Sequence, residues 1–427
     1  MNGRSRFVTL RFPNGLATKG ERFLAEFTLS GVEVLRMTIL VALLAGCSRP
    51  TDNRIQLSYQ TIETLPEQQA IHQEIVAEFE RAHPNVHVNV VYDTSKFQKL
   101  NVQLAGNAAP DVFYYIVDRL PALARGGQVQ DLTEDFAPLA GQFYPEVVDA
   151  CRIGGKLWMV PFHFSTDILF YNRDWFEQAG EPAPDDSWDW QKFADVTARL
   201  AALRQARIAT VLPRPLLLVQ SFGGELFAGG KCTVDSPESV AALQFYRDLV
   251  ARRIAPTTAS LGEVEAFDGV NLFRDGKIPV LVGRTYMLTE FDHITSFHWG
   301  VAPVPKGKLR WSRLSVGGNC IWSRTKHPHE AWEFVKFYSI EGAKLAATSR
   351  DAIPALKAVA TTAQFPPVMT EALTYSHLDN PWGYVFWDEF DQRAFFETTD
   401  AVALGRTTPA EALRSIEALG NSLLSPR

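Results

Sequence analysis

The stretch LNVQLAGNAAPDVFYYIVD, residues 100–118, contains three local signals in a row. An amphipathic segment comes first, then Gly106, Asn107 and Pro110 interrupt it, and an apolar run follows. Glycine, asparagine and proline between two patterned segments mark a turn, and a short apolar run after a turn is typical of a buried strand. The stretch therefore predicts a helix, a turn and a strand.

The segments upstream extend this pattern. RIQLSY, residues 54–59, predicts a strand, and VHVNVVY, residues 86–92, alternates valine with other residues as a half-buried strand does. Between them, residues 67–84 repeat apolar residues at every fourth position, which predicts a helix that ends before Pro84. The order strand, helix, strand, helix, strand implies an α/β lobe with a largely parallel sheet.

Strand and helix patterns continue to the end of the chain. Residues 155–172 form a long extended apolar stretch, and GKIPVLVG, residues 276–283, predicts a further strand. Helices are predicted over residues 187–203 with Ser187 as N-cap, 235–250 with Pro237 near the first turn, 327–347, and 407–424 with Thr408 as N-cap and Pro409 at the first position. One face of the third helix gathers Ala331, Phe334, Val335 and Tyr338.

TILVALLAGCSRPTDN, residues 38–53, contains a short apolar run that ends at Cys47. A bilayer-spanning helix needs about 20 apolar residues, and this run has about half that, as the core of a signal peptide does. The segment resembles the lipobox of bacterial lipoproteins, which implies acylation of the Cys47 thiol and cleavage just before it; the alternative is a short buried helix. We expect residues 1–46 to be a signal peptide with an over-long N-terminus, whose true start lies near residues 32–37, and residues 47–54 to be a lipidated tether.

The charge of the mature chain argues against a nucleic-acid partner. Residues 1–46 hold six basic and three acidic residues, so of 42 Lys+Arg and 48 Asp+Glu in the whole chain, 36 and 45 remain, a formal charge of −9. A protein that binds nucleic acid needs a basic face. About 380 residues exceed one ordinary hydrophobic core, so two lobes are expected. After Cys47, no segment of the sequence is long and apolar enough to span a membrane.

Three cysteines follow Cys47: Cys151, Cys232 and Cys320. They lie far apart and form no CxxC pattern, so the sequence signals no metal or redox motif. We expect three buried free thiols, with one disulfide as the alternative.

The sequence contains no constellation typical of an enzyme. GGELFAGGKC, residues 223–232, lacks the first glycine and the Ser/Thr of a phosphate-binding loop, and neither GxSxG nor HExxH is present. Asp388, Glu389 and Asp391 lie too close in sequence to face each other across a sugar as glycosidase carboxylates do, so we expect a solvated face. The sequence predicts no enzyme, no cofactor and no metal site.

Four segments resemble, in order and spacing, the extracellular solute-binding proteins of ABC importers, specifically the sugar-binding group that includes maltose-binding protein. They are FERAHPNVHVNVVY (79–92), LAGNAAPDVFYYIVDRLPALARGGQVQDLTEDF (104–136), GKLWMVPFHFSTDILFYNRDWFEQAGEPAPDDSWDW (155–190) and SVGGNCIWSRTKHPHEAWEFVKFYS (315–339). The second contains the most recognisable signature, and in the fourth Gly317-Gly318 precede a predicted strand. TTPAEAL (407–413) also fits, so the resemblance covers nearly all of the mature chain.

This resemblance implies an α/β, two-lobed periplasmic-binding-protein fold, with a ligand cleft between lobes that close about a hinge. By analogy, the chain crosses between the lobes near residues 163–168, 312–320 and 365. The first lobe would then comprise residues 55–165 and 314–365, and the second residues 166–313 and 366–427. Because ligands of open α/β sheets bind beyond the carboxyl ends of the strands, the loops after the predicted strands should line the cleft.

A sugar site needs planar polar groups that bind pairs of hydroxyls and aromatic rings that pack against C–H faces. Asp118 and Arg119 align with an Asp-Arg pair that binds sugar in the maltose-binding protein family; the alternative is a surface ion pair. Ser165 aligns with a family carboxylate, a departure that suggests a different hydroxyl pattern, and Asp167 and His163 are neighbours that could substitute.

The remaining candidate ligand-binding residues follow other predicted strands or lie where the family presents stacking rings: Gln60, Thr61, Glu63, Phe222, Arg284, Tyr286, Gly318, Asn319, Trp382, Tyr384 and Trp387. The alternative roles are helix capping for the first three, close backbone approach for Gly318, and core packing for the aromatic residues after position 380.

The sequence therefore predicts a lipid-anchored, monomeric solute-binding protein in the periplasm or on the outer face of a bacterial membrane. We expect it to capture a carbohydrate and deliver it to the permease subunits of an ABC importer. The alternatives are a binding protein for a polyamine or a polyol phosphate, a secreted carbohydrate-active enzyme, and a structural or adhesion lipoprotein.

Overall fold

The computed structural model describes residues 52–62, 66–95, 97–257, 269–347, 352–361, 365–381 and 383–424. All the elements named below belong to the unit formed by residues 55–427. The predicted signal segment 1–46 and Cys47 lie outside the described residues.

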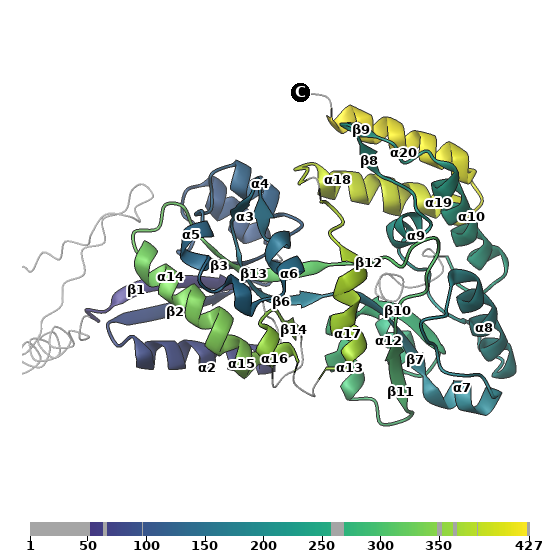
Figure 1. The fold of residues 1–427 in the computed structure, drawn as a ribbon, viewed down its shortest axis with the longest axis horizontal. Coiled ribbons are helices and arrows are strands. Elements are labelled where there is room, and N and C mark those ends of the chain that lie inside the picture. The colour runs from purple at the N-terminus through teal and green to yellow at the C-terminus, as the bar shows by residue number, and fades with distance from the viewer. Residues whose placement is uncertain are drawn as a thin grey trace, which may run out of the picture. The chain divides into compact units, whose positions relative to one another are not determined.

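One sheet has six strands and, with its helices, is called the first lobe here (Figure 1). Its strands in spatial order are β14 (Ile353–Pro354), β6 (Val160–Ser165), β13 (Ser315–Ile321), β3 (Val112–Ile116), β1 (Ile55–Thr61) and β2 (Val86–Tyr92). β1 is parallel to β2 and β3, whereas β13 is antiparallel to β3 and β6, and β14 is antiparallel to β6. The prediction of a largely parallel sheet is therefore correct only for β1, β2 and β3, because the later strands return to the sheet in alternating directions.

The stretch at residues 100–118 folds as predicted into a helix, a turn and a strand, namely α3 (Gln98–Ala105), the turn and β3. Asp111 fixes the start of β3, because its carboxylate accepts hydrogen bonds from Ser58 Oγ at 2.6 Å and from Thr325 Oγ1 at 2.5 Å. Ser58 belongs to β1 and Thr325 follows β13, so one carboxylate ties together the strands on both sides of β3.

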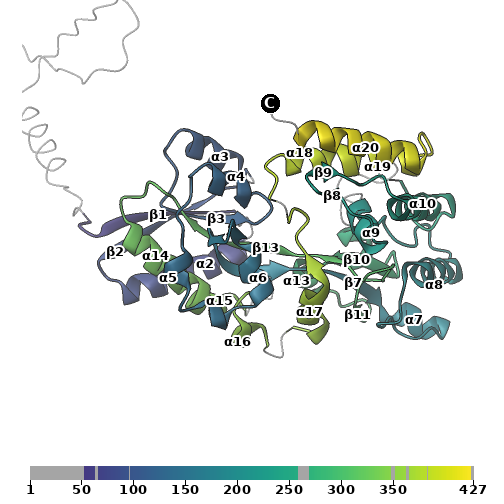
Figure 2. The same cartoon turned by 45° about the horizontal axis from the view of Figure 1, so that its top comes forward.

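The helices of the first lobe pack through aromatic side chains. Phe79 of α2 (Pro66–Ala82) lies 5.1 Å from Phe334 of α14 (Pro328–Phe337) between ring centroids, and Tyr59 of β1 lies 5.2 Å from Phe334. The predicted apolar face of the 327–347 helix is confirmed, because its four members are all buried. The helix passes through a π-helical turn, η4 (Tyr338–Gly342), into α15 (Ala343–Ala346), and both contact α2 (Figure 2). The other helices of this lobe are α4 (Leu120–Arg125), α5 (Thr133–Phe136), α6 (Pro145–Ala150) and α16 (Lys357–Ala360).

A second sheet has three antiparallel strands in the order β10 (Val280–Arg284), β7 (Asp167–Asn172) and β11 (Trp299–Ala302), and is called the second lobe together with its helices. Every residue of the central strand β7 is buried, which explains its unbroken apolar character. Phe170 of β7 packs on Phe291 with ring centroids 4.8 Å apart. The helices of this lobe include α7 (Arg173–Ala179), α8 (Trp190–Leu203), α9 (Pro215–Ser221), α10 (Pro237–Ala251), α12 (Val270–Arg274) and α13 (Leu288–Asp292).

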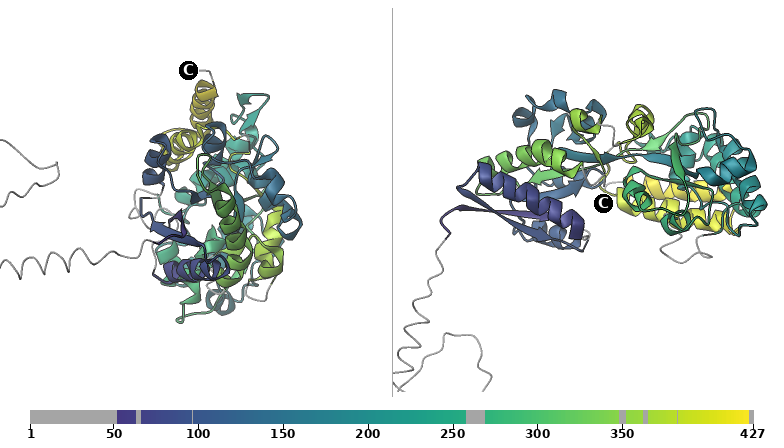
Figure 3. Two further views of the ribbon diagram at one scale, coloured as in Figure 1. Left: turned by 90° about the vertical axis from the view of Figure 1, so that its left-hand side faces the viewer. Right: turned by 90° about the horizontal axis from the view of Figure 1, so that it is seen from below.

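The C-terminal helices α18 (Trp387–Asp391), α19 (Thr399–Ala403) and α20 (Pro409–Leu424) join the second lobe, where α19 and α20 contact α10 (Figure 3). Thr408 caps α20 as predicted: its Oγ1 accepts from Glu411 N–H at 3.3 Å, and Glu411 Oε2 accepts from Thr408 N–H at 3.0 Å. The prediction of Ser187 as a cap is wrong. Asp189 caps α8 by accepting from Lys192 N–H at 2.7 Å, while the Ser187 hydroxyl donates to Asp185.

The chain passes between the two sheets at short crossings. Thr166 alone separates β6 from β7. At the second passage, β12 (Ser312–Arg313) lies just before β13 and pairs in parallel with β15 (Ser376–His377). These positions fall within the ranges expected for the first two crossings, while the lobe boundaries given above remain a prediction.

Two predictions about small residues have clear outcomes. Cys151, Cys232 and Cys320 are buried free thiols, as expected. Gly317 and Gly318 lie within β13 rather than before it. A Cβ atom at Gly318 would clash with the Val160 carbonyl, so the close approach of β6 requires a glycine here.

Candidate ligand-binding site

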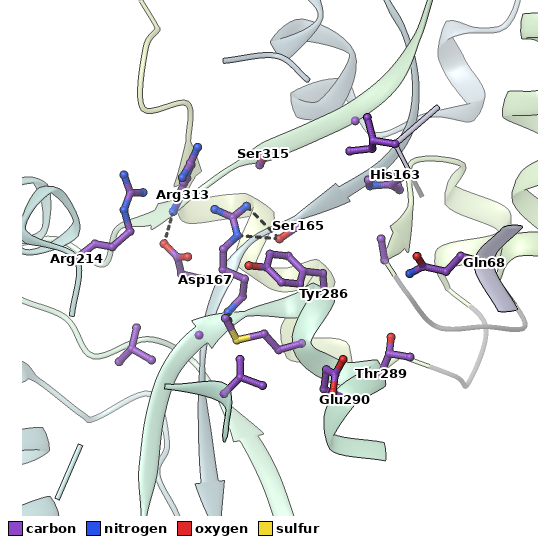
Figure 4. Close-up of a pocket in the computed structure, with 18 of the residues that line it drawn as sticks. Gln68, His163, Ser165, Asp167, Arg214, Tyr286, Thr289, Glu290, Arg313 and Ser315 are labelled. Atoms are coloured by element: carbon purple, nitrogen blue, oxygen red, sulfur yellow. Dashed lines mark hydrogen bonds between the residues drawn. The ribbon is translucent and has the colours of Figure 1, made fainter. Parts of the chain in front are cut away.

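A cavity of about 1160 Å³, the large cavity, opens at the crossings and takes its wall from both lobes (Figure 4). Its polar wall includes five predicted residues from the first crossing and from the end of β10 and the turn after it, together with residues that were not predicted as ligand contacts. The predicted residues are His163, Ser165, Asp167, Arg284 and Tyr286, and the others include Gln68, Arg214, Thr289, Glu290, Arg313, Ser315 and Asp391.

A network of buried charges lies under this wall. Arg313 Nη2 lies 2.5 Å from Asp118 Oδ2, and Arg313 Nε lies 2.9 Å from Asp379 Oδ2. Arg214 Nη1 lies 3.0 Å from the same Asp379 oxygen. Burial raises the pKa of the Asp379 carboxyl, but Arg214 and Arg313 outweigh burial and hold this pKa below its ordinary value. The network joins the loop after β3 to the second crossing and to the segment after β15.

Asp391 at the end of α18 belongs to the same network. Its carboxylate lies 3.5 Å from Arg214 Nη2, and 20% of its side chain is exposed. Burial raises the pKa of Asp391 to about 6, against the opposing effect of Arg214. The expectation of a solvated acidic face is therefore wrong for Asp391, because α18 turns this residue toward the cavity, whereas Asp388 and Glu389 are exposed as expected.

Arg284 ends β10 and reaches across to β6, where its Nε and Nη2 donate to Ser165 Oγ at 3.2 and 3.1 Å. Its guanidinium also lies 5.7 Å from the ring centroid of Tyr286, whose side chain is 43% exposed. Burial lowers the pKa of Arg284, Arg313 lowers it further, and Asp167 acts in the opposite direction. Asp167 pairs with Arg284 in the strand register, but its carboxylate accepts from the backbone N–H of Arg313 at 3.1 Å.

His163 forms part of the first-lobe wall. Its ring stacks on Tyr114 with centroids 5.7 Å apart, and Tyr114 Oη lies 3.2 Å from His163 Nε2. Gly317 makes this stack possible, because a Cβ atom there would collide with the Tyr114 hydroxyl and lie 2.7 Å from His163 Cε1.

A second cavity of about 410 Å³, the small cavity, collects other predicted residues. Asp118, Arg119, Tyr384 and Trp387 all contribute to its wall. Arg119 Nε lies 3.0 Å from Asp388 Oδ2, an ion pair between α18 and the residue that precedes α4. Trp387 is only 3% exposed and packs on Phe390 with ring centroids 5.7 Å apart.

The other predicted residues lie apart from both cavities or outside the described residues. Gln60 is buried and its Nε2 donates to Asp93 Oδ2 at 3.0 Å, while the carbonyl of the buried Thr61 accepts from Asp93 N–H. Phe222 packs on Phe245, and Gly318 and Asn319 are buried in β13. Glu63 and Trp382 lie outside the described residues. Contact with a ligand remains a prediction for every candidate residue.

Two negative observations hold for the described residues alone. They contain no cluster of three or more His, Cys, Asp or Glu side chains placed to hold a metal ion. Within the same part of the chain, no helix has both the length and the apolar character that a membrane crossing requires.

Comparisons with known proteins agree on one family. Residues 63–344 match the bacterial extracellular solute-binding proteins. A lipoprotein of Streptomyces antibioticus is 28% identical over 326 residues, 71% of each chain. An arabinooligosaccharide-binding protein of Bacillus subtilis is 25% identical over 328 residues, 70% of this chain and 74% of its own. An ABC substrate-binding protein from Listeria monocytogenes, solved in complex with cycloalternan, superposes with a TM-score of 0.75 at 24% identity over 86% of this chain and 98% of that chain. The predicted two-lobed fold is thereby confirmed.

Proposed function

Because this chain belongs to the bacterial extracellular solute-binding protein family, we propose that it captures a carbohydrate in the large cavity and delivers it to the membrane subunits of an ABC importer. One observation carries the choice of ligand: at the crossings, guanidinium, carboxylate and hydroxyl groups share the wall of one cavity with the half-exposed ring of Tyr286. Carbohydrates need both features, because they offer hydroxyls to planar polar groups and C–H faces to aromatic rings.

The relatives support the same class of ligand. One of them is named for binding arabinooligosaccharides, and the Listeria structure holds cycloalternan. The cavity volume of about 1160 Å³ suits an oligosaccharide, since it exceeds the range of roughly 300–1,000 Å³ that is usual for small-molecule sites.

The proposed mechanism is capture without chemistry. Ligand enters the open cleft, the lobes rotate about the short crossings, and the closed form docks on the permease as a monomer. The ligand shifts this equilibrium only by its differential affinity for the closed state.

A thermal-shift screen of neutral and acidic oligosaccharides, including arabino- and α-gluco-oligosaccharides, tests the proposal. A ligand at 100 times its dissociation constant stabilises the folded protein by about 2.7 kcal/mol. Chromatography of the recovered sugar separates the binding protein from a carbohydrate-active enzyme. Unaltered sugar supports capture, and steady release of smaller sugars would overturn it.

We also propose that Cys47 carries a lipid anchor. The support is the apolar run that ends at this residue and the lipoprotein among the relatives. The Cys47→Ser variant should leave the membrane fraction while it binds sugar normally. A variant that still sediments with membranes would contradict the anchor and leave the carbohydrate proposal untouched.

A further inference from the structure

Four arginines line the large cavity, and they differ in whether a carboxylate forms an ion pair with them. They are Arg214, Arg274, Arg284 and Arg313. Arg214 and Arg313 pair with Asp379, and Arg274 Nη1 lies 3.4 Å from Glu290 Oε2. Among the described residues, Arg284 forms no ion pair, and the hydrogen bonds that its side chain donates there go to the neutral hydroxyl of Ser165.

The described neighbours of Arg284 do not provide a carboxylate that forms an ion pair with it. Asp167 is the carboxylate nearest along the strand register, but it is 5% exposed and accepts the Arg313 backbone N–H. Arg313 adds positive potential at Arg284, and Asp167 opposes it, although no ion pair joins Asp167 to Arg284 among the described residues. A guanidinium carries five N–H donors, so two donors directed at one hydroxyl oxygen leave hydrogen-bonding capacity at the cavity wall. Removing a cation from water without pairing it with an anion costs free energy. A bound anion would offset this desolvation cost at Arg284.

Tyr286 indicates which kind of anion would fit. Its half-exposed ring lies beside the Arg284 guanidinium, with 5.7 Å between the guanidinium carbon and the ring centroid. A uronic acid has the matching arrangement, since a carboxylate projects from the edge of a sugar ring whose faces carry C–H groups. The ring would pack on Tyr286 and the carboxylate would pair with Arg284, where planar two-point recognition is favourable.

We propose that the large cavity binds an acidic oligosaccharide, and that the carboxylate of one uronic acid residue pairs with Arg284 next to Ser165. This inference rests on the proposed carbohydrate function and narrows it. A carboxylate fits better than a phosphate, because a single unpaired arginine balances one negative charge, and Asp167 and Asp391 on the same wall oppose a second.

The test is calorimetry on the mature chain with matched neutral and acidic sugars. Suitable pairs differ by one carboxylate: galactotriose with the trisaccharide in which one galactose is replaced by galacturonic acid, and xylotriose with its counterpart that carries a single glucuronic acid. Galactotriose that carries one phosphate group is the phosphorylated counterpart of the same length. The acidic member of at least one pair should bind at least tenfold more tightly than the neutral member and than the phosphorylated sugar.

Two variants and one control assign the preference to Arg284. Arg284→Gln should remove the preference for the acidic sugar. Ser165→Glu should also remove it, because it places a carboxylate next to Arg284 within the protein. Arg199→Gln removes an exposed arginine of α8 outside the cavity and should keep the preference. Melting curves of the free proteins report folding.

The outcomes separate this inference from the proposed function. If the wild-type protein binds neutral sugars as well as acidic ones, or prefers the phosphorylated sugar, the inference is overturned and carbohydrate capture stands. An acidic preference that survives in Arg284→Gln also overturns it. If none of the sugars in the wider screen binds, the proposed function fails and the inference fails with it.

Discussion

Arg313 and Asp118 form an ion pair with 2.5 Å between Nη2 and Oδ2, although 195 residues separate them in the chain. Asp118 follows β3 in the first lobe, and Arg313 lies in β12 at the second crossing. The side chain of Asp118 is 7% exposed. The sequence predicts Asp118 as a sugar ligand, and its position beside Arg313 gives it a structural role at the crossing as well.

The Asp118→Asn variant should therefore lower the free energy of unfolding of the ligand-free protein. Loss of a hydrogen bond to a charged group costs about 1.5–3 kcal/mol, and Arg313 would retain its ion pair with Asp379. Urea unfolding without sugar measures the change. Asp149→Asn, which removes an exposed carboxylate from the first lobe, is the matched control. Wild-type stability in Asp118→Asn would assign this residue to ligand contact alone.

A second prediction concerns the glycine beside the His163–Tyr114 stack. Gly317→Ala should destabilise the protein, because the new methyl group would meet the Tyr114 hydroxyl and the His163 ring. Overpacking of this kind costs about 1–3 kcal/mol. Gly141→Ala is the control, since a Cβ atom at Gly141 has no heavy atom within 4 Å. Equal unfolding curves for the two variants would show that the Tyr114 and His163 rings can shift to accommodate the new methyl group.

The elements of the first lobe could be predicted because their signals are local. The alternation of Val86, Val88 and Val90 and the apolar face that contains Phe334 lie within single strands or helices, so one segment is enough to reveal them. The lobed arrangement was predicted from the resemblance to a family, and the fold comparison confirms it.

The charged network could not be predicted, because its partners meet only after folding. Arg214 and Asp379 are 165 residues apart, and no local pattern distinguishes either from a surface residue. The same limit applies to Trp387. A tryptophan in an aromatic-rich segment suits either a stacking platform or a core, and its 3% exposure favours the core.

Trp387→Ala should accordingly affect stability more than affinity. Removal of a large buried aromatic side chain costs about 3–5 kcal/mol, and the expected result is a large loss in urea unfolding with an unchanged dissociation constant for sugar. Val385→Ala shortens an exposed side chain of the same segment and should change neither quantity. If the Trp387→Ala protein is stable but has a larger dissociation constant for sugar, Trp387 contacts the ligand.

Tyr286 should behave in the opposite way. Because 43% of its side chain is exposed at the large cavity, Tyr286→Ala should leave the unfolding curve nearly unchanged and weaken sugar binding by at least about 1 kcal/mol, the usual threshold for an important contact. Tyr286→Phe keeps the ring and should retain most of the affinity. Calorimetry with a sugar from the screen measures both. Wild-type affinity in Tyr286→Ala would show that the Tyr286 ring does not contact the sugar.

The last prediction follows from the buried carboxyl of Asp391. Burial raises the pKa of Asp391 to about 6, with Asp379 and Asp118 also raising it and Arg214 and Arg313 lowering it. In the unfolded chain an aspartate titrates near 3.9. Folding therefore favours the protonated form, and the stability that this group contributes is complete below about pH 4 and is lost as the pH rises through about 6.

Asp391→Asn mimics the protonated carboxyl and should therefore be more stable than the wild-type protein above pH 6, by up to about 3 kcal/mol at 1.36 kcal/mol for each pKa unit. The two proteins should become equally stable below about pH 4, where Asp391 is protonated in both the folded and the unfolded chain. Urea unfolding at intervals from pH 4 to 8 measures the difference. Asp388→Asn removes an exposed carboxylate from the same helix and controls for the loss of one negative charge. A constant difference between Asp391→Asn and wild type across this range would mean that the folded protein leaves Asp391 solvated, as the sequence alone suggests.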